Sequence, residues 1–266
     1  MADKYYVPFS KKIGQSETRY KNNILYGFDK QLKSTSEWLG TTEARDFFRQ
    51  EKIDLHNFLK ESELYKNLDK IIQSNASSSE QYVETFYKQG SKKGHKDIKR
   101  TLKFTKADEK ALYYLKNYNF KLIRNVNNDL RYGLRRSLTR AVIEGKSIGE
   151  LRKEILELPL TPIRNFSPHT RARMIARTEY SRARNTGNLQ AYANYGVETV
   201  EIITANDNFV CDLCLDIEEH NPYSITDSNN LPPFHTNCRC TVAPVTALSS
   251  YQNAPLENPN IVNLIP

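Results

Sequence analysis

Five residues with soft ligand atoms lie near the C-terminus of the 266-residue chain. They form a C-x2-C pair, Cys211 and Cys214, and an H-x2-C-x-C group, His235, Cys238 and Cys240. Thiolates and imidazole are preferred ligands of tetrahedral zinc, and a two-residue spacer lets one turn present both sulfurs to the same ion. Residues two apart in an extended segment share a face, so Cys238 and Cys240 can point the same way. The spacing therefore predicts a structural zinc site, held by Cys211, Cys214, Cys238 and either His235 or Cys240.

Two other states of the cysteines stay open from the residues alone. The four thiols could form two disulfides in an oxidising compartment, or they could be free and buried. The first ten residues contain no apolar signal segment. The sequence also contains no run of eighteen apolar residues, so no membrane span is expected. We therefore expect a protein made in a cytosol, where thiols stay reduced, and this favours the metal.

The elements that must position these ligands are mainly helical. An apolar stripe from Leu112 to Leu138 predicts a long central helix from Thr105 almost to Gly145, about 55–60 Å long. Capping signals at Ser147 and at Ser167 start two more helices, and the second runs towards Gly196. Small residues along that last helix favour close approach of another backbone; they are Ala172, Ala176, Ala183, Gly187 and Ala191.

β-branched alternation over 197–205 and again over 241–245 predicts two strands that flank the cysteines. The expected fold class is α+β, a mostly helical body with a long central helix and a small C-terminal β module organised by the Cys/His site. We expect an N-terminal helical region over 1–100, a second helical part over 101–196, the β module over 197–248 and an extended tail over 249–266. Within the first region, a helix with Thr42 as its cap runs through Leu68, and 74–79 (S-N-A-S-S-S) is a loop.

Charge divides the chain sharply. Residues 1–196 carry 38 Lys and Arg against 22 Asp and Glu, a net charge of +16, whereas the part after Gly196 has nine acids and one base, a net charge of −8. A Lys-rich segment over 88–106, with Gly90 and Gly94, is expected to be a flexible loop that contacts phosphates of double-stranded DNA. Its candidate DNA-binding residues are Lys88, Lys92, Lys93, Lys96, Lys99, Arg100 and Lys103. The alternative is an ordinary solvated surface.

Several motifs occur together in one order along the chain. They are I-A-R-T-E (175–179), R-A-R-N-T-G-N-L-Q-A-Y (182–192), D-N-F-V-C-D-L-C (207–214) and P-P-F-H-T-N-C-R-C-T (232–241). Over roughly 100–245 the chain resembles the phage Mu F-like minor head proteins, also called head morphogenesis proteins. Many members of that family have a tryptophan where this chain has Ile202-Ile203, and this departure does not touch the cysteine site.

The resemblance implies a minor protein of the head interior of a tailed-phage virion. It further implies association with the portal and the packaged DNA, a role in head morphogenesis and in DNA ejection, and contacts with scaffold or major capsid protein. The basic body agrees with a DNA partner independently. No membrane segment is expected in such a protein.

Two other classes of function compete with a structural role. A zinc-dependent enzyme acting on nucleic acid would be expected to carry H-x-E before P-C-x-x-C, or H-E-x-x-H, and neither occurs. Glu179 with Arg177 could be an acid and its electrostatic partner, but an internal salt bridge or a cap of the strand module is the favoured interpretation. A cellular zinc-ribbon DNA-binding protein predicts basic residues beside the cysteines, and only Arg239 is there. We therefore expect no catalytic residues and no enzyme activity.

Overall fold

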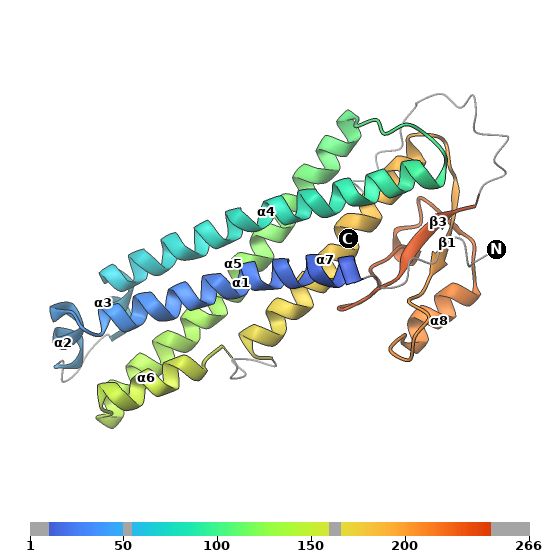
Figure 1. Cartoon of the computed structure of the whole chain (residues 1–266). Helices are drawn as coiled ribbons and strands as arrows, with labels where there is room; N and C mark the ends of the chain where they lie inside the picture. The colour runs from blue at the N-terminus through green and yellow to red at the C-terminus, as the bar shows by residue number, and fades with distance from the viewer. Residues whose placement is uncertain (1–10, 50–54, 160–165, 246–266) are drawn as a thin grey trace. The chain divides into compact units, whose positions relative to one another are not determined.

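The computed structural model of the chain describes residues 11–49, 55–159 and 166–245 (Figure 1). Helices dominate these residues, and a small antiparallel sheet follows them, so the predicted α+β class is confirmed. The elements are α1 (Lys11–Trp38), α2 (Thr42–Phe48), α3 (Leu55–Glu61), α4 (Glu63–Asp97), α5 (Lys106–Glu144), α6 (Ile148–Glu157), α7 (Pro168–Ala193), β1 (Thr199–Ile203), α8 (Asp212–Glu219), β2 (Tyr223–Ser224), the 3-10 turn η2 (Ser228–Asn230) and β3 (Thr241–Pro244). Among the described residues, no helix is both long and apolar enough to cross a membrane.

The chain divides into two compact units. Unit 1 comprises residues 1–19, 80–119 and 174–266, and unit 2 comprises 20–79 and 120–173. Helices α1, α4 and α5 each contribute residues to both units. The predicted tail over 249–266 lies outside the described residues.

Local sequence signals set most of the helix starts. Ser147 and Glu150 form the predicted capping box of α6, and Ser167 accepts the backbone N–H of Thr170 at the start of α7 (3.2 Å). The long helix predicted from Thr105 is α5. The cap of α2, however, is Thr41 and not the predicted Thr42, which is the first helical residue.

Unit 2 is a helical assembly with a polar network inside it. Its buried apolar side chains include Phe28 of α1, Leu68 of α4 and Leu130 of α5. Between these helices, Asn127 Oδ1 accepts from Gln31 Nε2 (2.8 Å), and Asn127 Nδ2 donates to Asn75 Oδ1 (2.9 Å). Each of these three side-chain amides bonds an amide on another helix, so the network fixes which faces of the helices meet.

The predicted loop over 74–79 is wrong, because these residues lie inside α4. Ser78 and Ser79 donate to the carbonyl of Asn75, and Asn75 Nδ2 donates to the carbonyl of Asn23 on α1 (2.7 Å). Polar side chains that would favour a turn in isolation are thus satisfied by the helix itself and by a neighbouring helix. The single helix predicted through Leu68 is also wrong, since α3 ends at Glu61 and α4 starts at Glu63.

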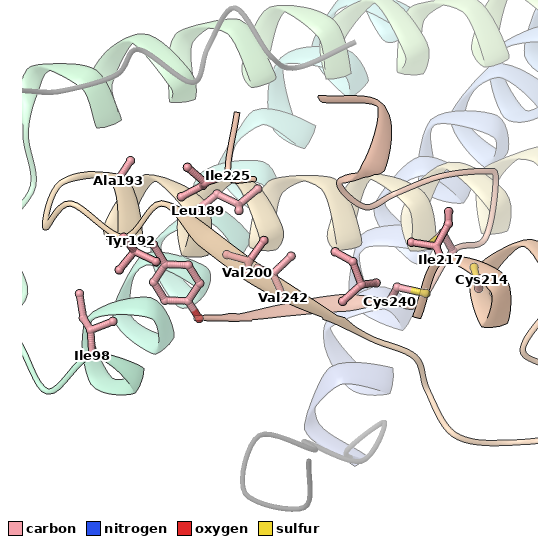
Figure 2. Packing of buried hydrophobic residues seen from close by; sticks show 13 residues of the cluster. Ile98, Leu189, Tyr192, Ala193, Val200, Cys214, Ile217, Ile225, Cys240 and Val242 are labelled. Atoms are coloured by element: carbon pink, nitrogen blue, oxygen red, sulfur yellow. The ribbon is translucent and has the colours of Figure 1, made fainter. Parts of the chain in front are cut away.

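Unit 1 contains the sheet, which has the order β2-β1-β3 with both pairings antiparallel. In the central strand β1, Ile202 pairs with Val242 of β3, and Val200 pairs with Tyr223 of β2. The sheet packs with α7 and α8 into one hydrophobic cluster that includes Tyr192, Ile217 and three of the four cysteines, Cys214, Cys238 and Cys240 (Figure 2). The cysteine module therefore shares its core with the end of the helical body.

Within unit 1, α4 and α7 approach at glycines. A Cβ atom on Gly90 would lie 1.9 Å from the carbonyl oxygen of Arg184, and one on Gly187 would lie 2.3 Å from the carbonyl oxygen of Tyr87. Only residues without a side chain permit this distance between the two backbones. The close approach predicted from the small residues of α7 is therefore present at Gly187, and its partner helix is α4.

Candidate metal centre

The first two ligands lie at the N-terminus of α8. Cys211 is the N-cap residue and is exposed, whereas Cys214 is in the first turn and is 3% exposed. Both cysteines therefore lie in the first turn of one helix or directly before it. The two-residue spacer acts here as one helical turn rather than as an open loop.

The imidazole of His235 is aimed at both of these sulfurs. Its Nε2 lies 3.2 Å from Cys211 Sγ and 3.1 Å from Cys214 Sγ. Its Nδ1 lies 2.8 Å from the carbonyl oxygen of Thr236, which can only accept a hydrogen bond. In the tautomer with the proton on Nδ1, the lone pair of Nε2 faces the sulfurs, which is the arrangement of a metal-ligating histidine.

The remaining two cysteines join from the segment that enters β3. The Sγ atoms of Cys214, Cys238 and Cys240 all lie within 4.8 Å of one another, and the ligand atoms of Cys211, Cys214 and His235 do the same. Cys214 belongs to both groups, and all four cysteines are free thiols. The structure thus brings together all five residues predicted from the spacing.

The thiols of this cluster differ strongly in acidity. A hydrogen bond from Cys240 holds the pKa of Cys238 down at about 6, although burial opposes this. The same contact, together with burial, raises the pKa of Cys240 well above its ordinary value, and burial raises the pKa of Cys214 to about 12. A buried group of thiols and one imidazole with a free lone pair could hold a soft or borderline metal ion, whose charge would offset that of the thiolates.

Helix α7 holds the ligand-bearing segment in place. Asn185 Nδ2 donates to the carbonyl of Cys240 (2.9 Å), and Asn185 Oδ1 accepts from the Thr241 hydroxyl (3.2 Å). Thr178 Oγ1 accepts the backbone N–H of Asn237 (3.0 Å), a residue in the left-handed conformation with φ of 68°. These contacts fix both ends of the tetrapeptide that carries Cys238 and Cys240. No local pattern in the sequence predicted these contacts, because their partners lie more than fifty residues away in the chain.

A second support is the ion pair between Arg239 and Asp207. Both guanidinium nitrogens Nη1 and Nη2 of Arg239 bond the Asp207 carboxylate, which precedes Cys211 by four residues. This bonding lowers the pKa of Asp207 to about 2. The only basic residue after Gly196 is therefore engaged in linking the two ligand-bearing segments to each other.

Glu179 is an internal ion-pair partner in the structure. Its Oε1 lies 3.3 Å from Nε of Arg182, not of the predicted Arg177, which instead pairs with Glu17 (3.5 Å). Glu179 is 3% exposed, and burial raises its pKa. The pairing with Arg177 was wrong because a spacing of three residues places Arg182, and not Arg177, one helical turn away on the same face.

The Lys-rich segment is not the flexible loop that its glycines predicted. Residues 88–97 are the last turns of α4, and Gly90 and Gly94 face the backbone of α7. Two of the candidate DNA-binding residues are engaged with acids, Lys88 with Glu84 and Lys93 with Asp97. The guanidinium of Arg100 lies 5.4 Å from the ring centroid of Tyr195.

The other four candidates are exposed. Lys92 and Lys96 lie one turn apart near the end of α4, and Lys99 and Lys103 lie in the segment that connects α4 to α5. Within the described parts of the chain, the structure gives none of these four an acidic partner. These four lysines therefore remain available to contact a polyanion.

Taken together, the fold and the site define an α+β protein in which a helical body holds a small cysteine-rich module with a candidate metal centre. Residues 133–243 match the family described as Phage Mu protein F like protein. The match contains α6, α7, the sheet and all five candidate ligands. No match was found among curated proteins, and none among solved structures.

Proposed function

We propose that this chain is a minor protein of the head interior of a tailed-phage virion, with a structural rather than a catalytic role. The observation that carries the proposal is the family match over 133–243, which covers the candidate metal centre and the helix that supports it. Head morphogenesis is the role that this family supports. Association with the portal and with packaged DNA, and a part in DNA ejection, are finer elements of the same proposal.

The metal of the proposal is one structural zinc ion. In a tetrahedral site with Zn–S of about 2.3 Å and Zn–N of about 2.0 Å, ligand atoms are separated by roughly 3.5–3.8 Å. The distances from His235 Nε2 to Cys211 Sγ and Cys214 Sγ, 3.2 and 3.1 Å, are slightly shorter than such an edge. These distances support His235 as the proposed third ligand, with Cys238 or Cys240 as the proposed fourth. When bound, the ion would tie α8 to the start of β3 and close the long connection between them.

The test of the site is the zinc content of protein purified without chelators. We expect about one zinc per chain, lost in Cys211→Ser and in His235→Ala, with faster proteolysis within 207–241. His220→Ala is the matched control, because His220 is the exposed C-cap residue of α8 and its imidazole contacts Asp216 of the same helix. Comparison of Cys238→Ser with Cys240→Ser identifies the fourth ligand. If the purified protein contains no metal, and residues 207–241 are ordered with their sulfurs bonded in pairs, the cysteines form disulfides and the zinc proposal is wrong.

Duplex DNA is the proposed polyanion partner. Lys92, Lys96, Lys99 and Lys103 project from one short stretch of unit 1, and each cation that neutralises a phosphate steepens the salt dependence of binding by about 0.9 in the log–log slope. Replacing all four with Gln should reduce the slope by about 3–4 and weaken binding equally on unrelated DNA sequences. The control removes the same charge from exposed lysines of unit 2, namely Lys30, Lys33, Lys60 and Lys70. An unchanged slope in the first variant would exclude this surface as the DNA contact.

The portal contact is tested by co-expression. We expect the chain to co-purify with the cognate portal protein and to be detected in intact virions in the head fraction. Scaffold and major capsid protein serve as the comparison partners in the same experiment. If the protein is absent from virions and does not associate with the portal protein in vitro, the proposed portal contact is wrong.

A further inference from the structure

Unit 1 has two exposed segments of opposite charge, and each also carries exposed apolar side chains. The first, here called the acidic surface, comprises Phe209 and the exposed residues of α8. Its apolar members are Phe209, Leu213 and Leu215, which are 85%, 50% and 49% exposed. Its exposed acids are Asp212, Asp216 and Glu219. Large apolar side chains that are about half exposed or more contribute little to the core, and clusters of them commonly mark an interaction site.

The second, here called the basic surface, is formed by the connection between α4 and α5. Leu102 is 55% exposed and Phe104 is 43% exposed. The exposed cations Lys99, Lys103 and Lys106 are interspersed with these apolar side chains over residues 99–106. Three cations and two apolar side chains on this surface therefore complement three acids and three apolar side chains on the other.

We infer that a second copy of this chain is the partner, with the acidic surface of one copy bound to the basic surface of the next. Each surface is exposed, so the two do not cover one another within a single chain. A contact between two different surfaces of identical chains is head-to-tail, and such contacts build rings or open chains rather than closed dimers. The apolar side chains supply the attraction, and the opposite charges select the partner and the orientation.

The two surfaces are small, so the association should be weak and salt-dependent. Sedimentation velocity of the full chain, freed of nucleic acid and at about 100 μM, should show association at low salt and a dissociation constant at least about tenfold higher at 0.5 M salt. Nuclease treatment should leave the association unchanged. Loss of association on nuclease treatment would mean that DNA bridges the copies, and a monomer at low salt would overturn the inference directly.

Two variants separate a head-to-tail contact from other self-association. Phe209→Ser with Glu219→Lys disables the acidic surface, and Leu102→Ser with Lys103→Glu disables the basic surface. Each variant alone should be monomeric, but an equal mixture should form a 1:1 dimer, because one intact acidic surface meets one intact basic surface. Ile143→Ser, an apolar residue of unit 2 that is 76% exposed, is the matched control and should associate as the wild type does. A mixture that stays monomeric would overturn the head-to-tail contact, and unfolding curves of each variant show that the fold is kept.

The inference does not rest on the proposed function. It concerns exposed side chains that are neither candidate metal ligands nor, apart from Lys99 and Lys103, candidate DNA contacts. The two proposals fail separately, because zinc content and DNA affinity are measured on the monomer, whereas the mixing experiment reads only association.

Discussion

Replacing Gly90 with Ala tests whether α4 and α7 are held together by backbone contact. The added Cβ would lie 1.9 Å from the carbonyl oxygen of Arg184 and 2.8 Å from the carbonyl carbon of the same residue. Both atoms belong to the backbone of α7, so no side-chain rotation can relieve the overlap. The two helices would have to separate locally.

The size of the effect follows from the distance. Ordinary contact between such atoms lies near 3.5 Å, so the helices must move apart by roughly 1.5 Å. Overpacking of this kind costs about 1–3 kcal/mol. Separating α4 from α7 also loses the contacts between the two helices around Gly94 and Gly187. The higher helix propensity of alanine offsets about 0.5–1 kcal/mol of this destabilisation. A net destabilisation of about 2 kcal/mol is therefore expected, or a fall in melting temperature of about 4–8 °C for a chain of this size.

The control is the same substitution at Gly149. This residue lies in α6, and the nearest atom to its added Cβ is Ser147 Oγ at 3.8 Å, an ordinary contact. Gly149→Ala should therefore stabilise the protein by about 0.5–1 kcal/mol. Thermal and urea unfolding, followed by circular dichroism, measure both variants. The reasoning is refuted if Gly90→Ala is as stable as the wild type while Gly149→Ala behaves as expected.

Three further predictions concern polar contacts. Asn185→Ala leaves the buried carbonyl of Cys240 without its donor, so we expect a loss of about 1–3 kcal/mol and faster proteolysis within 207–241, measured by limited digestion. Asn127→Ala interrupts the buried amide network of unit 2 and should lower the free energy of unfolding by about 2–4 kcal/mol in urea titrations. Bonds from Lys116 and Lys88 lower the pKa of Glu84 from an ordinary 4.5 to about 2, so its contribution to stability is present above pH 4.5 and disappears as the pH falls to 2. The stability difference between wild type and Glu84→Gln should shrink over that range, and a constant difference would contradict the assignment.

Much of the fold is determined locally by the sequence. The stripe from Leu112 to Leu138 predicted α5 because every third or fourth residue of a helix returns to the same face. The capping residues Ser147 and Ser167 predicted helix starts because their hydroxyls bond N–H groups three residues away. The cysteine spacing predicted the ligand cluster in the same way, because a turn of α8 and an extended entry to β3 are short-range geometry.

The tertiary structure decided what depends on partners distant in the chain. Gly90 and Gly94 have the composition of a loop, and the sequence by itself assigned them to one. Their role is to admit the backbone of α7 about a hundred residues later, and no local pattern records that partner. Asn75 and Ser79 likewise stay helical because α1 and their own helix satisfy them. Asn185 and Thr178 became supports of the candidate metal centre only when α7 and the start of β3 met. The sequence by itself determined which atoms could bind a metal, and the packing of α7 determined what holds them in place, because a hydrogen bond between distant segments exists only after the chain has brought them together.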